Sequence, residues 1–102
     1  MPRKKTKKTP SKEEARNIFH RAFGDGSVRY TNHSRDRMGE RGIDANDLMQ
    51  LSVAGLIYNE PEPDINTGEM KFLIQCQKMD LKVVFTIHNK KTIRLITVMN
   101  CK

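Results

Sequence analysis

The chain has 102 residues, the length of a single domain, and 36% of them are hydrophobic, with no tryptophan. Its apolar runs are far shorter than the roughly 18 residues that a membrane-spanning helix needs. No apolar stretch follows the basic N-terminus, as it would in a secretory signal. The two cysteines lack ligand-like spacing and support neither a zinc site nor a disulfide scaffold. We therefore expect a reduced, cytoplasmic, non-membrane protein without metal or cofactor.

The net charge of +7 is concentrated at the N-terminus, because residues 1–12 contain no acidic residue. We expect a disordered basic tail over residues 1–12 and a single folded domain over residues 13–102. Such a tail can bind nucleic-acid phosphates without reading sequence, or can serve only to keep the chain in solution. Both interpretations stay open. The tail residues that would contact phosphates are Lys4, Lys5, Lys7 and Lys8.

A first helix is predicted directly after the tail. Ser11 and Glu14 have the spacing of a capping box, in which each side chain bonds the other residue's backbone. Apolar residues then recur three or four positions apart, so one stripe of this helix is expected to be buried. The glycine-rich segment 24–27 ends the helix, and residues 28–30 are expected to form a short extended link.

Two more helices follow. The second is predicted over residues 32–41, with Gly42 as its C-terminal glycine. The third begins at Asp44, a good N-cap residue, and ends at Gly55. The first half of the domain therefore holds up to three helices.

After Gly55 the period of the apolar residues changes to two, which is typical of strands. Residues 56–60 are a short candidate, and residues 70–76, 82–88 and 93–99 alternate clearly. The links between the last three are short enough for hairpins. The sequence therefore predicts an α+β domain with two to three helices on one face of a roughly four-stranded antiparallel meander.

The segment YTNHSRDRMGERGIDANDL, residues 30–48, resembles the T-x-H-x3-R-M-x-E-R-G-I pattern of a family of small, mostly uncharacterised prokaryotic domains. The segment TIRLIT, residues 92–97, is similar to the last strand of BrnT-type toxins, within the wider RelE/ParE-like group of toxin ribonucleases. The resemblance covers roughly residues 28–100. It implies a RelE/ParE-like fold in a bacterial or phage protein, RNA cleavage on or off the ribosome, and a cognate antitoxin as partner.

Three residues of the motif are candidates for catalysis. His33, Arg37 and Arg41 are four positions apart and lie along one side of the predicted helix. RNA cleavage without a metal needs a proton-transfer group and cations that neutralise the scissile phosphate. Histidine and arginine supply these functions. A structural role is the alternative, since Arg37 and Arg41 could instead pair with acidic residues, namely Asp36, Glu40 or those of 60–69.

Residues of the predicted sheet could complete this set. His88 is the candidate for a second proton-transfer group, and Arg94 and Lys82 are candidates for binding the RNA substrate. The leading hypothesis is a metal-independent ribonuclease toxin of a toxin–antitoxin pair. The alternative is a non-catalytic module that binds protein or nucleic acid and uses the His/Arg helix only for structure.

Overall fold

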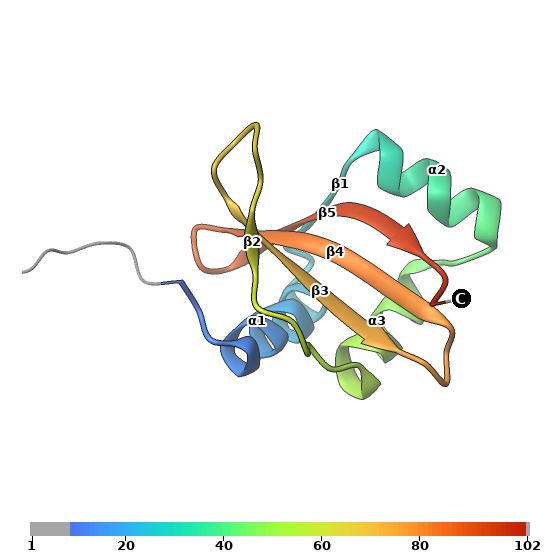
Figure 1. The fold of residues 1–102 in the computed structure, drawn as a ribbon. Helices are drawn as coiled ribbons and strands as arrows, with labels where there is room; N and C mark the ends of the chain where they lie inside the picture. The colour runs from blue at the N-terminus through green and yellow to red at the C-terminus, as the bar shows by residue number, and fades with distance from the viewer. Residues whose placement is uncertain (1–8, 102) are drawn as a thin grey trace, which may run out of the picture.

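The structure is a computed structural model that describes residues 9–101, and these form three helices and one five-stranded sheet (Figure 1). The α+β class is thus confirmed. The elements in chain order are α1 (Lys12–Asp25), β1 (Val28–Tyr30), α2 (Asn32–Arg41), α3 (Ala45–Ala54), β2 (Glu62–Pro63), β3 (Met70–Cys76), β4 (Leu81–His88) and β5 (Thr92–Met99).

Local sequence signals set the helix ends. The Ser11 side chain accepts a hydrogen bond from the Glu14 backbone amide, and the Glu14 carboxylate accepts one from the Ser11 amide. Asp44 and Asp47 form the same reciprocal pair at the start of α3. Each pair satisfies two backbone donors that a helix start leaves without partners. The capping box predicted at Ser11 is therefore confirmed.

The sheet has the strand order β1-β5-β4-β3-β2, and β3, β4 and β5 form the expected antiparallel meander. It differs from the prediction at both edges. Residues 28–30, expected to be only a link, pair in parallel with residues 93–95 of β5. Residues 56–60 contribute only a bridge from Leu56 to Gln75, and the edge strand is Glu62–Pro63 instead. A proline is compatible with this position because an edge strand does not need every amide.

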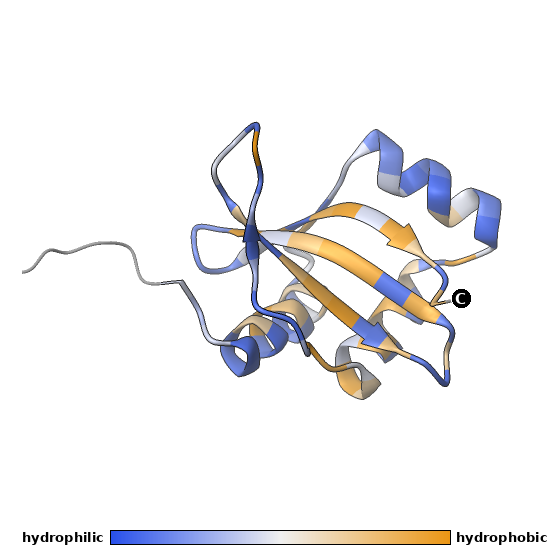
Figure 2. Ribbon diagram, viewed as in Figure 1, coloured by the Kyte–Doolittle hydropathy of each residue, from blue (hydrophilic) through white to orange (hydrophobic). Residues whose placement is uncertain are grey.

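One face of the sheet is buried under α1 and α3 (Figure 1). The Phe85 ring lies 4.7 Å from the Phe19 ring of α1 and 5.6 Å from the Phe72 ring of β3, measured between centroids. All three side chains are almost fully buried. The orange apolar segments of the strands in Figure 2 reflect this core. The alternating residues of the strands thus divide the sheet into a core face and an open face.

The open face is the side of the sheet turned away from α1 and α3. Strand register places on it the residues that alternate with the buried ones: Arg29, Lys71, Leu73, Gln75, Lys82, Val84, Thr86, His88, Thr92, Arg94, Thr97 and Met99. Helix α2 packs against β5 and lies beyond the end of β1 (Figure 1). Two of the three helices therefore cover the core face, whereas α2 lies at the margin of the open face.

The two glycines of α2 give a matched test of its C-terminal end. Gly42 follows the helix with φ +66, whereas Gly39 lies inside the helix, and an added Cβ would meet no atom at either position. We expect Gly42→Ala to lower the free energy of unfolding by about 1–2 kcal/mol, because left-handed backbone strains an L side chain. Gly39→Ala should raise it by about 0.5–1 kcal/mol, since alanine is the better helix former. Chemical denaturation measures both, and equal effects would contradict the assigned helix end.

Candidate functional site

The three candidates on α2 each contact another group of the protein. His33 Nε2 lies 3.0 Å from the Thr97 hydroxyl of β5. Arg37 forms an ion pair with Glu40 at 2.7 Å, and Arg41 Nε donates a hydrogen bond to the Asn100 side chain at 2.9 Å. The contacts of His33 and Arg41 attach the helix to the end of β5, whereas the Arg37 ion pair lies within the helix itself. These contacts match the structural alternative, and Glu40 is the expected acidic residue that pairs with Arg37 and Arg41.

The structure does not bring His88 to this helix. His88 pairs with Thr92 at the start of β5, whereas His33 contacts Thr97, five residues further along the same strand. At about 3.3 Å per residue, the two histidines are attached to points roughly 16 Å apart. Lys82 is also distant from His88, because it is at the other end of β4, opposite Met99 of β5. The predicted set therefore divides into an α2 group and a group around His88.

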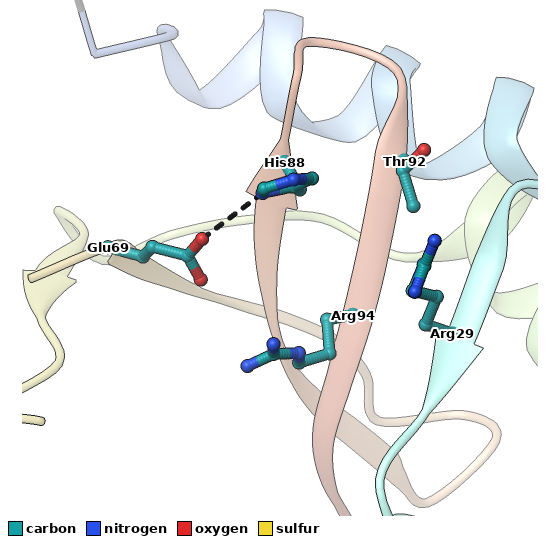
Figure 3. Close-up of a pocket in the computed structure, with 5 residues that line it drawn as sticks. All are labelled: Arg29, Glu69, His88, Thr92 and Arg94. Carbon is teal, nitrogen blue, oxygen red and sulfur yellow. Dashed lines mark hydrogen bonds and ion pairs between the residues drawn. The ribbon is translucent and has the colours of Figure 1, made fainter. Parts of the chain in front are cut away.

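The group around His88 lines a pocket of about 110 Å³ on the open face (Figure 3). The five lining residues come from strands β1, β4 and β5 and from the position just before β3: Arg29, Glu69, His88, Thr92 and Arg94. In Figure 3 the Arg29 side chain lies beside Thr92, and the Arg94 side chain extends toward the side of Glu69. Two guanidinium groups and one hydroxyl thus border the same small space, and all of them can donate hydrogen bonds to an anion.

His88 is held by Glu69. Its Nδ1 lies 3.4 Å from the Glu69 carboxylate, and both side chains remain in contact with solvent. An ionised carboxylate can only accept a hydrogen bond, so Nδ1 carries the proton in this contact. In the neutral imidazole this leaves the lone pair on Nε2. The pair therefore has the arrangement in which a carboxylate orients a histidine, and its 3.4 Å separation is longer than that of a typical hydrogen bond.

The volume of the pocket limits its ligand. Sites for drug-sized molecules measure about 300–1,000 Å³, and one water occupies about 30 Å³. The 110 Å³ of this pocket holds a phosphate-sized group but not a nucleoside. With Arg29 and Arg94 on its border, the pocket is suited to a small anion such as phosphate.

Three residues of this pocket were missing from the sequence prediction, namely Arg29, Glu69 and Thr92. A signal existed for two of them. Counting back along the antiparallel hairpins from their short turns places Glu69 and Thr92 opposite His88. Arg29 had no such signal. A segment of three residues is too short to show the alternation of apolar and polar residues, and its sequence does not indicate which strand it pairs with in parallel.

Tyr30, next to Arg29 in the sequence, does not join the pocket. Burial raises the pKa of its phenol above the ordinary value, although the Arg35 guanidinium, 5.4 Å from the ring centre, acts in the opposite direction. The phenol therefore stays protonated at neutral pH. The Tyr30 side chain is on the face of the strand opposite to that of Arg29, so it does not line this pocket.

Other expected features can be placed in part. Lys4, Lys5, Lys7 and Lys8 lie outside the described residues. Within residues 9–101, no three His, Cys, Asp or Glu side chains are grouped as they would be to hold a metal ion. None of the helices described is long and apolar enough to cross a membrane.

Comparison with known proteins gives one family. No curated protein and no solved structure matches the chain. Residues 30–100 match the family described as "Domain of unknown function (DUF4258)". This range begins at the His/Arg helix motif and ends with the last strand, and it contains His88, Glu69, Thr92 and Arg94 but not Arg29. Since the match spans well over half of the sequence, the chain belongs to the DUF4258 family.

Proposed function

We propose that this protein acts on RNA, as a metal-independent ribonuclease whose site is the pocket around His88. The observation that carries the proposal is the placement of an oriented histidine beside two arginines in a space of phosphate size. Its support includes the resemblance of the motif and of the last strand to BrnT-type and RelE/ParE-like toxins. Within that scheme the protein is the toxin of a toxin–antitoxin pair.

The reaction would be an internal transesterification of RNA. Arg29 and Arg94 bind the non-bridging oxygens of the scissile phosphate and neutralise the charge that develops there. His88 Nε2 takes the proton of the adjacent 2′-hydroxyl, whose oxygen then forms a bond to phosphorus. The bond from phosphorus to the 5′-oxygen breaks, and this oxygen receives a proton from the imidazolium or from water. The products are a 2′,3′-cyclic phosphate and a 5′-hydroxyl end.

The α2 group has a different place in this proposal. His33 and Arg41 hold the helix against the end of β5, and Arg37 pairs with Glu40 of the same helix. All three lie too far from His88 to act on the same phosphate. Lys82, near the other end of β4, could contact only a distant part of a bound RNA. The proton-transfer role first expected of His33 therefore passes to His88.

The test is incubation of the full chain with single-stranded RNA in the presence of EDTA, followed by analysis of the fragment ends. We expect 2′,3′-cyclic phosphate and 5′-hydroxyl ends, and no cleavage of the corresponding DNA. Induction of the wild-type protein in a sensitive host should stop growth. RNA binding without fragments would contradict the catalytic proposal and favour the non-catalytic binding module. Cleavage that EDTA abolishes would contradict the metal-independent mechanism.

A further inference from the structure

The pocket is one part of a longer row of side chains across the sheet. Strand register places Arg29 of β1 beside Arg94 of β5, Arg94 beside Thr86 of β4, and Thr86 beside Lys71 of β3. All four residues are on the open face. At about 4.8 Å between neighbouring strands, the row is about 14 Å long from Arg29 to Lys71. It ends at Glu62 of β2, which is opposite Lys71 and carries the opposite charge.

Positive charge on the open face is concentrated in this row. The next row toward the C-terminal end of β5 consists of Thr97, Val84 and Leu73, none of which is charged. Lys82 is the only cation of the row after that, beside Met99 and Gln75. A polyanion bound parallel to the strands would therefore contact one cation of this row. A polyanion bound across the strands would contact three in succession, namely Arg29, Arg94 and Lys71.

Thr86 adds an independent observation at the centre of the row. Its side chain is 1% exposed, and its hydroxyl has no hydrogen-bond partner within residues 9–101. A buried hydroxyl without a partner costs free energy, so the site favours a ligand that supplies an acceptor. The long side chains of Arg94 and Lys71 flank it on either side. If they turn outward to bind phosphates, the hydroxyl becomes accessible to a ligand oxygen.

Among residues 9–101, no phenylalanine or tyrosine side chain lies on the open face, where the bases of the ligand could stack on it. Phe19, Phe72 and Phe85 are in the core, Phe23 and Tyr30 pack against it, and Tyr58 is in the loop before β2. Proteins that bind single strands by their bases use aromatic stacking. Here the recognition must therefore depend on the phosphate backbone and tolerate different sequences.

From these observations we infer that single-stranded RNA binds across the strands of the open face, with Lys71 holding a phosphate on the far side of His88 from Arg29. The inference deepens the proposed function and rests on it, since it names the path of the same substrate. Lys71 is a substrate-positioning residue on this path. Its role does not require that the bound RNA be cleaved.

The experiment uses a short 2′-O-methyl oligouridylate, which has no free 2′-hydroxyl and so reports binding alone. Its affinity for the full-length wild type, Lys71→Gln and Lys78→Gln is measured over a series of salt concentrations. Lys78 is the matched control, because it is an exposed lysine in the turn between β3 and β4, outside the row. For single strands, each phosphate contact contributes about −0.7 to the slope of log affinity against log salt.

We expect Lys71→Gln to reduce the magnitude of this slope by about 0.7, with Lys78→Gln close to wild type. An oligoadenylate of equal length should bind about as well as the oligouridylate. Equal slopes for the two lysine variants would overturn the path while leaving the proposed ribonuclease activity in place. Failure of the wild type to bind either oligonucleotide would overturn both. Binding of polyglutamate with the same dependence on Lys71 would overturn the RNA assignment in favour of an acidic protein partner.

Discussion

Replacement of His88 by alanine is expected to lower the rate of RNA cleavage by about 10²–10⁴-fold, the usual contribution of a general acid or base. The fold should remain intact, because His88 is exposed at the end of β4 and only its contact with Glu69 is lost. Single-turnover cleavage of a labelled RNA measures the rate, and the unfolding transition checks the fold.

Two further variants make this result specific. Glu69→Gln keeps the shape of the side chain but removes the charge that fixes the His88 proton on Nδ1, so the rate of cleavage should fall. His33→Ala separates the two groups of candidates, because it removes a histidine that contacts Thr97 instead. Loss of cleavage in His33→Ala with retention in His88→Ala would contradict the site on the sheet.

Replacement of Phe85 by alanine is expected to lower the free energy of unfolding by about 3–5 kcal/mol, which is typical when a buried aromatic side chain is truncated. Phe85 is fully buried, and its ring connects α1 to the sheet through contacts with Phe19 and Phe72. A small domain has a total stability of only about 5–15 kcal/mol, so the variant should unfold at much lower denaturant concentration.

The control for this prediction is Tyr58→Ala. Its side chain is 59% exposed, and a substitution at such a site usually changes stability by no more than about 0.5 kcal/mol. Urea denaturation of both variants measures the two changes in the free energy of unfolding. The comparison requires that this free energy fall with urea concentration at the same slope in both variants. Similar losses at Phe85 and Tyr58 would show that the core is not centred where the structure places it.

Much of the fold could be predicted because its signals are local. The capping box at Ser11, the glycine after Arg41 and the alternation in residues 70–76 each depend on neighbours within a few positions. Local hydrogen bonds and the two-residue period of a strand produce such patterns. The antiparallel hairpins followed for the same reason, since a short turn fixes the register of its two strands.

The sheet edges could not be predicted in the same way. The strand β1 has three residues and pairs with a segment more than sixty positions away, so its sequence carries no period and no nearby partner. At the other edge, the pairing of Glu62 and Pro63 with β3 depends on how the loop folds back. These long-range pairings determine which residues line the pocket, because the pairing of β1 with β5 is what places Arg29 beside Arg94.

The candidate site was predicted in part. His88 and Arg94 were chosen for their chemistry, and the structure brings them together in one pocket. His33, Arg37 and Arg41 were chosen for their spacing along one helix, and that spacing says nothing about which strand the helix meets. The contacts with Thr97 and Asn100 show that α2 lies along the end of β5 away from the pocket.

We propose that RNA binds the open face around His88 rather than α2. The most direct test is to record backbone amide NMR spectra of the full chain during titration with a short 2′-O-methyl oligouridylate. We predict that the largest shifts occur at Arg29, Thr92 and Arg94, with smaller ones near Lys71. Shifts confined to residues 32–41, or an unchanged spectrum, would contradict the claim.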